Sequence, residues 1–197
     1  LPKDDVAKLE AGLKERGIPL NAVMKMKPWI LSSFVALPAC EFARKARGAS
    51  FLDMKLANDA LADGKELVGL ETILEQIEAL SDLPMPYHIH SLIDMLELGD
   101  RMEDVMATMI DLYLKGEIAM IMPMMKSIDD NVAERQNEYD AFEQRVINDR
   151  NHVMADRATP HLEKGNVFMA VGALHLPGKI GVVELLREKG FTLTAVQ

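Results

Sequence analysis

Most of the chain carries apolar residues three or four positions apart, the spacing that places them on one face of an α-helix. In residues 4–16, Val6, Leu9 and Leu13 share such a face, acidic residues stand at the start and Gly17 follows the last turn. The same spacing predicts further helices over residues 29–46 on both sides of Pro38, 52–62, 72–80, 87–126 with breaks at Gly99 and Gly116, within 132–157, and over 180–189.

Three short stretches read as strands instead. Residues 66–70 (ELVGL) and 166–171 (NVFMAV) are short apolar runs, and residues 191–196 (FTLTAV) alternate apolar and polar side chains. Strand, helix and strand within residues 166–197 have the size of a βαβ unit, about 30 residues. Three strands are few for a sheet covered by so many helices, so further strands are either unrecognised or absent from this sequence.

These elements predict a mixed α/β (α+β) fold in a single domain over residues 1–197. We expect a small mixed sheet flanked by many helices. Residues 72–160 form the expected helical middle, which is rich in methionine. The βαβ unit at 166–197 closes the chain.

The composition narrows the class of protein without indicating a function. The chain has 197 residues, 49% of them hydrophobic, and a formal net charge of −9. This is enough apolar material for a buried core, and too acidic for a general nucleic-acid binder, which shows a basic surface. The single cysteine, Cys40, cannot form an internal disulfide. The longest apolar stretch, residues 28–40, is shorter than the about 20 residues of a membrane-spanning helix.

The strongest local feature is the loop at residues 172–178 (GALHLPG), between an apolar strand and a helix. Ligands in open α/β sheets gather beyond the carboxyl ends of strands, where His175 lies, and Gly172 lets the backbone turn there. A neutral imidazole at this place can bind a metal or act as a base, although a lone loop histidine is more often structural. Glu71 has the matching position after residues 66–70. It is either a partly desolvated carboxylate that needs a partner or an acid in the first turn of the next helix.

Arg150 is the third candidate because it lies in the middle of an apolar helical face. Val146 and Met154 stand four positions before and after it, and Asn151 adjoins it. A buried guanidinium must meet a carboxylate, backbone carbonyls or a bound anion. We expect Glu71 to be its partner. The alternative is a purely structural ion pair.

Other groups carry weaker signals. His88 and His90 would share a metal only in an extended segment, whereas their surroundings look helical and turn the two rings apart. The methionines allow copper binding, adaptable core packing or a groove for a peptide or a membrane surface, and core packing is favoured over copper. No P-loop, dinucleotide-binding glycine motif, Gly-x-Ser-x-Gly or His-Glu-x-x-His occurs. The methionine group is Met102, Met106, Met109, Met120, Met122, Met124 and Met125.

Several of these motifs resemble those of the TraB/PrgY/GumN/TIKI family. Residues 171–178 (VGALHLPG), followed by Gly181 and residues 189–191 (KGF), resemble its C-terminal motif. Residues 64–72 (GKELVGLET), followed by Glu75 and Gln76, resemble its central motif. Residues 27–29 (KPW), 51–53 (FLD) and 150–151 (RN) match as well, so the resemblance runs in order along nearly the whole chain.

The resemblance implies a fold like that of the ChaN and erythromycin-esterase group, a mixed sheet flanked by helices. Animal members of the family, the TIKI proteins, are metal-dependent proteases that use two Gly-x-x-His motifs with acidic and basic residues. By this resemblance the second motif maps onto Gly172 to His175, the family glutamate onto Glu71 and the arginine onto Arg150. The first Gly-x-x-His has no match in this sequence, so we expect the family's first strand, and half of a metal site with it, to be missing here.

The resemblance thus predicts a metal-dependent, peptidase-like hydrolase acting on a peptide or a small molecule. His175 and Glu71 are the expected ligands of a divalent metal (zinc, manganese or cobalt), with Glu71 alternatively the general base. Arg150 is the expected third catalytic residue, and Asn151 and Gly172 are the expected binding residues. The missing motif favours the alternative, a non-catalytic module that binds a peptide or a partner on the same scaffold.

Two expectations concern the surroundings of the protein. The predicted sheet would have an exposed edge that a second copy can cover, which makes a homodimer an expected assembly. No N-terminal targeting segment can be seen in this sequence. The compartment therefore stays open between the bacterial cell envelope or periplasm and the cytoplasm.

Overall fold

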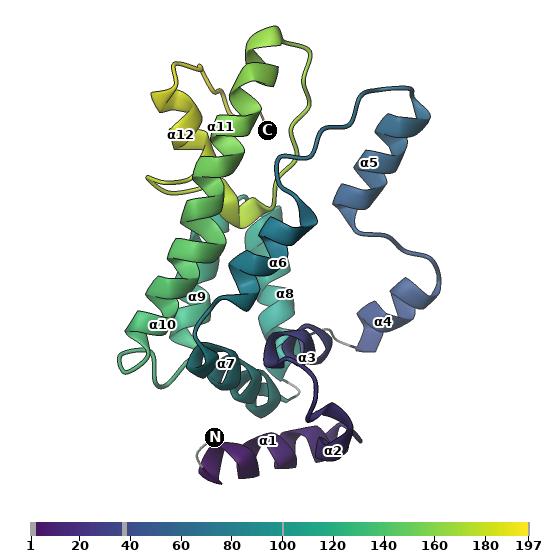
Figure 1. Ribbon diagram of the computed structural model, residues 1–197, viewed down its shortest axis with the longest axis vertical. Coiled ribbons are helices and arrows are strands. Elements are labelled where there is room, and N and C mark those ends of the chain that lie inside the picture. The colour runs from purple at the N-terminus through teal and green to yellow at the C-terminus, as the bar shows by residue number, and fades with distance from the viewer. Residues whose placement is uncertain (1–2, 37–38, 100, 197) are drawn as a thin grey trace.

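The structure, a computed structural model, describes residues 3–36, 39–99 and 101–196, and every regular element in these ranges is a helix (Figure 1). None of these helices combines the length and apolar content needed to cross a bilayer. In chain order the elements are α1 (Lys3–Glu15), α2 (Leu20–Val23), α3 (Pro28–Val35), α4 (Ala39–Ala46), α5 (Leu52–Ala62), α6 (Ile73–Ser81), α7 (Met85–Leu98), α8 (Arg101–Leu114), η1 (Ile118–Met120), α9 (Ile121–Ser127), α10 (Gln136–Phe142), η2 (Glu143–Asn148), α11 (Asp149–Lys164), η3 (Ala173–His175) and α12 (Val182–Glu188).

The predicted mixed α/β fold with a small sheet is wrong for the described residues, which contain no strand. The expected alternation exists at the C-terminus, where Phe191 and Leu193 are half-buried and the two threonines between and after them are exposed. A sheet also needs backbone hydrogen bonds between neighbouring strands, and none joins residues 66–70, 166–171 and 191–196. The alternation of apolar and polar residues therefore reflects which side of the segment is buried. It does not show that the segment pairs with another strand.

Two further expectations change with the sheet. The predicted βαβ unit at residues 166–197 reduces to α12 between two irregular segments. The exposed sheet edge that argued for a homodimer is not found in the part of the chain that the structure describes. The expectation of a single domain over residues 1–197 stays a prediction.

An N-terminal core lies where α1, α3 and α7 meet, at the lower end of the molecule in Figure 1. Gly12 of α1 allows the helices to approach, since a Cβ there would stand 2.7 Å from the Cβ of Leu96 on α7. The apolar face predicted for residues 4–16 is confirmed by the burial of Leu9 and Leu13. The buried members of this core are Leu9, Leu13, Leu31, Val35, Leu92 and Leu96.

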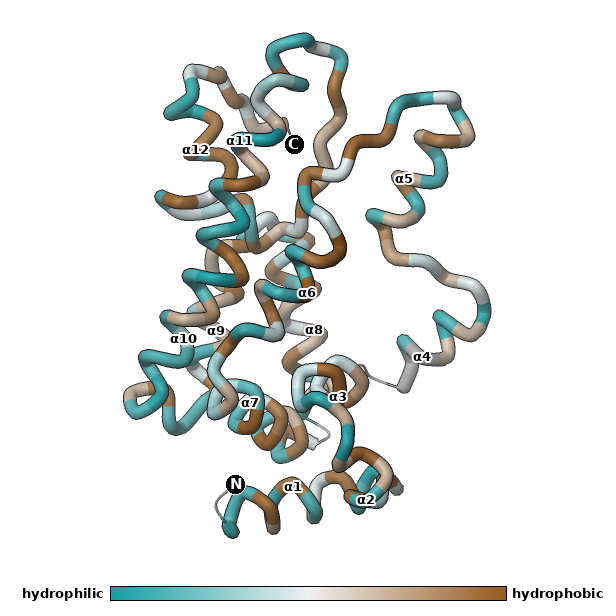
Figure 2. Tube along the Cα trace, viewed as in Figure 1, coloured by the Kyte–Doolittle hydropathy of each residue, from teal (hydrophilic) through white to brown (hydrophobic). Residues whose placement is uncertain are grey.

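A C-terminal core lies between α11 and α12 at the opposite end. Its buried members are Met154 and Ala155 of α11 with Val182, Leu185 and Leu186 of α12. All three segments that were predicted as strands pack against it. In Figure 2 the chain that enters α6 and the chain that leaves α11 are both coloured hydrophobic over part of their length. The half-buried contributions of the three segments are Leu70, Met169, Val171, Phe191 and Leu193.

The predicted helix within residues 132–157 is part of a longer rod made of α10, η2 and α11 (Figure 1). It begins at Gln136, contains π-helical geometry over Glu143–Asn148, and continues through Pro160 to Lys164. A π-turn inserts an extra residue into the helical register and is frequent at functional sites. Here the π-helical turn comes directly before Asp149, so it sets the direction in which the side chains of Arg150 and Asn151 project from the rod.

The other predicted helices are largely confirmed. The helical middle is present from α6 to α11, and α7 and α8 end next to Gly99 and Gly116 as predicted. The helix expected over residues 29–46 is found as α3 and α4. The break expected at Pro38 lies outside the described residues.

Candidate functional site

The candidate site forms where the loop at residues 172–181 meets the side of α11. His175 ends the short η3 helix and its backbone N–H donates to the carbonyl of Gly172 at 2.9 Å. Its side chain is buried. The loop is therefore folded back on itself, and the imidazole is turned inward toward α11.

Asn151 holds His175 in one orientation. The Nδ1 atom of His175 lies 2.6 Å from the Oδ1 of Asn151, and the Nδ2 of Asn151 donates to the backbone carbonyl of Ile180 at 2.7 Å. Because the Asn151 amide group donates to Ile180, its oxygen faces the ring and must accept, which puts the imidazole proton on Nδ1. In the neutral ring, Nε2 then carries the lone pair.

Arg150 and Glu71 form a two-pronged ion pair, the contact that the sequence predicted for Arg150. The Nε and Nη2 of Arg150 each donate to one carboxylate oxygen of Glu71 at 2.8 Å. The Nη1 of Arg150 also donates to the backbone carbonyl of Val146 at 3.2 Å. The Glu71 side chain is only 6% exposed, so its charge depends on Arg150 for compensation.

A second arginine supports the same segment. Arg157, two turns after Arg150 on α11, donates to the backbone carbonyl of Leu70 at 2.9 Å and to both oxygens of Glu75 at 2.8 and 2.6 Å. Glu75 belongs to a capping box with Thr72, whose backbone N–H donates to its carboxylate at 2.7 Å. Hydrogen bonds from Arg157 and Thr72 lower the pKa of Glu75 to about 2. The chain on either side of Glu71 is thus tied to α11.

The local electrostatics keep His175 neutral. Burial is the main cause that lowers the pKa of the imidazole, and the nearby Arg150 guanidinium lowers it further. The Glu71 carboxylate and the backbone of Ile147 raise the pKa, but they do not reverse the shift. The ion pair of Glu71 and Arg150 and the imidazole therefore belong to one electrostatic site.

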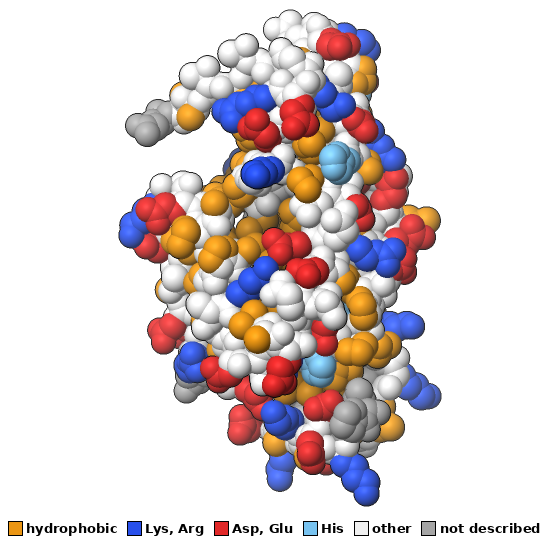
Figure 3. Space-filling view, turned by 90° about the vertical axis from the view of Figure 1, so that its left-hand side faces the viewer, with side chains coloured by type: hydrophobic (Ala, Val, Ile, Leu, Met, Phe, Trp, Pro, Cys, Tyr) orange, Lys and Arg blue, Asp and Glu red, His pale blue; other side chains and the backbone are white. Residues whose placement is uncertain are grey.

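An apolar cavity of about 460 Å³ adjoins the imidazole. His175 forms part of its wall, together with side chains of the rod and of the methionine-rich α8. Figure 3 shows hydrophobic side chains around a hollow on the side of the molecule where α11 and α12 lie. Ligand pockets are mostly apolar with a few polar groups that fix orientation, and this cavity fits that description. Its apolar lining includes Met106, Met109, Phe142, Val146 and Leu174.

The backbone turn expected of Gly172 does not require a glycine there, and its expected role as a binding residue stays a prediction. Its φ of −58° is open to any residue, and a Cβ there would meet the His175 ring at an ordinary 3.5 Å. The glycine that the loop needs is Gly181, where a Cβ would stand 2.3 Å from the carbonyl oxygens of Leu176 and Pro177. Gly181 appeared in the sequence only as part of a family motif, because close backbone approach leaves no periodic signal.

The described residues do not assemble a metal site on their own. No three His, Cys, Asp or Glu side chains gather there within reach of one ion. Both oxygens of Glu71 accept from Arg150, and His175 offers Nε2 alone. The donor set therefore falls short of the three protein ligands of a catalytic zinc site.

His88 and His90 lie as the sequence predicted, on the helix α7. The Nδ1 of His90 pairs with the carboxylate of Glu138 at 2.9 Å, while His88 is buried. The methionines Met106, Met109, Met122 and Met125 line cavities, and Met120 is largely exposed. The group is therefore spread over cavity walls and surface.

Sequence reasoning found Glu71, Arg150, Asn151 and His175, and these four side chains come together; their roles stay predictions. The comparisons with known proteins agree with the motifs that carry them. The model of the TraB/PrgY/gumN family matches residues 1–195, whereas no curated protein and no solved structure matches the chain. Since the matched region is nearly the entire sequence, the protein belongs to the TraB/PrgY/gumN family.

Proposed function

We propose that the chain hydrolyses a peptide or amide bond, with His175 as the base that activates water. One observation carries the proposal: a buried imidazole on the wall of an apolar cavity, whose Nδ1 is held by Asn151. That contact frees Nε2 to accept a proton. The lowered pKa of His175 keeps the ring in the form that a base requires near neutral pH.

The reaction balances with water as the only co-reactant. Nε2 of His175 takes a proton from water while the water oxygen bonds to the carbonyl carbon. The carbon–nitrogen bond then breaks, and Nε2 returns the proton to the departing nitrogen. Asn151 is a positioning residue in this scheme, because it fixes the ring and its tautomer.

Arg150 is the group that would stabilise the oxyanion. A guanidinium has five N–H groups, and the described contacts of Arg150 use three of them, on Nε, Nη1 and Nη2. The two others can donate to the developing charge, and Glu71 holds the guanidinium in place meanwhile.

Dependence on a divalent metal is a separate part of the proposal, and it rests on the family resemblance alone. The described residues do not fit a zinc, manganese or cobalt site, since Glu71 is engaged by Arg150. No step above therefore runs through a metal. Isothermal titration with each of the three ions measures this part directly. Binding that His175→Gln abolishes would support it, and no binding would leave the family's metal without a place here.

A second candidate is the non-catalytic module that binds a peptide or a partner. The observation in its favour is the same ion pair. A carboxylate with both oxygens held by Arg150 is poorly placed to act as a second base, so the site has a single group for proton transfer. In that case the apolar cavity beside His175 would hold a side chain without cleavage of the bond next to it.

The test is cleavage of a defined mixture of short peptides, followed by mass spectrometry of the new termini, with and without a chelator or added zinc, manganese or cobalt. His175→Gln should abolish cleavage. His152→Gln is the matched control, because His152 is exposed and adjoins Asn151 on the same helix, and it should leave cleavage unchanged. Peptides that bind but stay intact under every condition would reject hydrolysis and support the binding module.

A further inference from the structure

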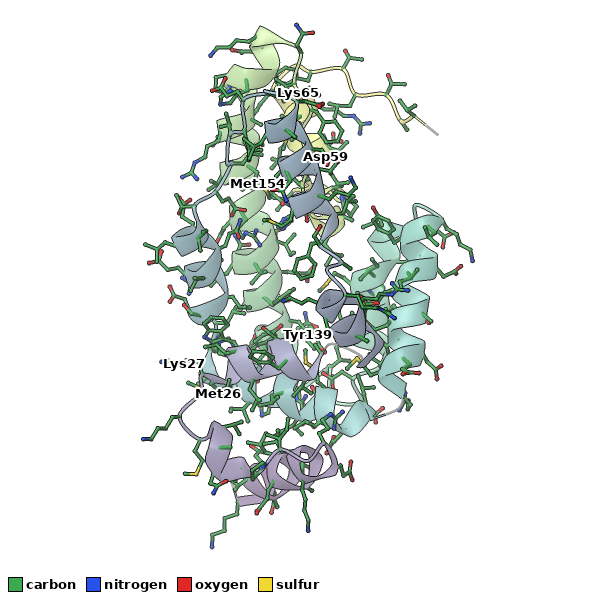
Figure 4. All side chains as sticks on the ribbon, turned by 90° about the vertical axis from the view of Figure 1, so that its right-hand side faces the viewer. Met26, Lys27, Asp59, Lys65, Tyr139 and Met154 are labelled. Carbon is green, nitrogen blue, oxygen red and sulfur yellow. The ribbon has the colours of Figure 1, made fainter. Side chains whose placement is uncertain are left out.

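A second cavity of about 510 Å³ lies between α3, α7, α9 and α10, and we call it the acidic chamber. It is lined by Trp29, Tyr87, Asp94, Arg135, Glu138 and Tyr139, among others. Figure 4 labels Tyr139 below Met154 of the C-terminal core, which places the chamber beneath that core.

Negative side chains outnumber positive ones around the chamber. Five carboxylate residues line it, against two arginines. Arg135 serves two of the carboxylates, since its Nη1 lies 2.6 Å from Asp94 and 3.7 Å from Asp129. The Asp129 side chain, 5% exposed, also accepts from the Tyr139 hydroxyl at 2.9 Å. Arg135 cannot neutralise both acids, so negative charge remains beside the buried Asp129 carboxylate.

Glu138 has no arginine or lysine partner among the contacts of the described residues. Its side chain is 19% exposed, and the partner that the structure gives it is the Nδ1 of His90, at 2.9 and 3.0 Å from its two oxygens. A histidine offers a full positive charge only when it is protonated. The negative charge of Glu138 is therefore available to a cation that enters the chamber.

An unused buried polar atom points to a ligand as well. His88 lines the chamber and is 4% exposed, and its Nε2 has no hydrogen-bond partner among the described residues. Backbone groups of Ser81 and Leu83 lie near the ring without bonding that nitrogen. A buried polar atom left without a partner is costly, and a bound ligand that donates to it removes the cost.

The aromatic lining suits a cation with an apolar stem. Tyr87 stacks on Phe142 with ring centroids 5.6 Å apart, and Trp29 is half-buried on the same wall. The ammonium group of Lys126 already lies over the Tyr139 ring, 5.7 Å from its centroid. Aromatic faces attract cations, and they also cover the methylene stem of a lysine or arginine side chain.

We propose that the acidic chamber binds the basic side chain of a peptide, an arginine or a lysine, with Glu138 as its counter-charge. The apolar cavity beside His175 shares Met109, Ile121, Phe142 and Leu174 with the chamber, so one ligand can occupy both. The inference deepens the proposed function, on which it rests for the peptide's fate, by naming its substrate class: an apolar side chain beside His175 and a basic one in the chamber.

Binding is tested without turnover, so that this inference and the hydrolysis can fail separately. Trp29 is the only tryptophan in the sequence, and it lines the chamber, so its fluorescence reports occupancy, with calorimetry as a second measurement. The probes are an acetylated Leu-Gly-Arg-Gly amide, the same peptide with neutral citrulline in place of arginine, and N-acetyl-arginine amide.

We expect the arginine peptide to bind at least about tenfold more tightly than the citrulline peptide, the loss of one charge-assisted contact. It should also bind about tenfold more tightly than N-acetyl-arginine amide, which cannot reach the cavity beside His175. Equal affinity for arginine and citrulline would overturn the inference. Equal affinity for the peptide and N-acetyl-arginine amide would overturn its peptide part, because a single arginine residue would then suffice.

Two variants separate the chamber from general surface charge. Glu138→Gln should erase the preference for arginine over citrulline. Glu134→Gln removes the same charge four residues earlier from an exposed side chain that does not line the chamber, and it should keep the preference. A preference that survives Glu138→Gln in a folded protein, checked by its thermal unfolding, would place the cation elsewhere.

Discussion

The core between α1, α3 and α7 contains only aliphatic side chains, whereas the core between α11 and α12 adjoins buried polar groups. In the first, helix packs directly on helix, and Gly12 lets α1 approach Leu96. In the second, two helices support three irregular segments, and Asn151, His175 and the ion pair of Glu71 with Arg150 lie at the boundary. One end of the molecule is stabilised by aliphatic packing, and the other brings ionisable and polar side chains together beside its core.

This difference predicts opposite responses to mutation. An aliphatic core loses stability in proportion to the volume removed. A buried polar site loses stability when one partner is removed, and it recovers when both partners are replaced by apolar groups. Measurements at the two ends of the same molecule can therefore separate packing from charge compensation.

The largest effect is expected for Arg150→Met. It leaves the 6% exposed carboxylate of Glu71 without its cation, and breaking such a pair costs about 3–5 kcal/mol. The double variant Glu71→Leu with Arg150→Met should recover most of this stability, because no buried charge is left. Urea unfolding, monitored by circular dichroism, measures the free energy of unfolding of both variants. A double variant as unstable as Arg150→Met would show that the pair is not the source of the loss.

Leu13→Ala tests the aliphatic core. Leu13 of α1 is fully buried in this core, and replacing a buried leucine by alanine costs about 2–5 kcal/mol. No second substitution at a polar partner can restore it, in contrast to the ion pair. The control is Leu114→Ala at an exposed position, which should change the free energy of unfolding by less than about 0.5 kcal/mol. A small effect at Leu13 would mean that the first core is loosely packed.

Glycine substitutions give a third, smaller contrast. Gly181→Ala puts a methyl group 2.3 Å from two rigid carbonyl oxygens, so overpacking should cost about 3 kcal/mol, the upper end of its usual range. Gly12→Ala meets the side chain of Leu96 at 2.7 Å, where α1 and α7 can shift slightly, and about 1 kcal/mol is expected. Gly172→Ala should be close to neutral. Equal losses at Gly172 and Gly181 would contradict the geometry of the loop.

The same two regions show what the sequence could predict. The helices of the first core followed from apolar residues at helical spacing, because each helix buries one face whatever its neighbour is. At the other end, Arg150 was singled out because a charge on an apolar face must have a partner, which is Glu71 as predicted. His175 and Glu71 were singled out as residues that follow strands, and that reason is wrong because the described residues contain no strand. Local patterns of burial and charge were therefore enough for the helices and for the contact between Arg150 and Glu71.

The rest depended on contacts between distant residues. Residues 166–171 and 191–196 have the composition of strands, but strand pairing is decided by a partner far along the chain. The need for Gly181 arises from backbone atoms of Leu176 and Pro177 that fold back on it, and the acidic chamber joins residues of α3, α7 and α10. No periodic pattern in the sequence indicates such contacts between distant residues.

The smallest effect concerns pH, and the buried histidines and Glu75 should lose their contributions to stability in different windows. Burial lowers the pKa of His88 on α7, and hydrogen bonds to Arg157 and Thr72 lower that of Glu75 to about 2. In both cases the unfolded chain binds the proton first, so the stabilisation is present above the unfolded pKa and is lost as the pH falls toward the folded one. For His88 the loss begins below about pH 6.5, and for Glu75 it runs from about pH 4.5 down to about pH 2. Thermal unfolding across this range should show both declines. His88→Leu should reduce the upper one, to which His175 also contributes, and Glu75→Gln should reduce the lower one. A single decline that neither variant alters would mean that other groups set the acid stability of both ends.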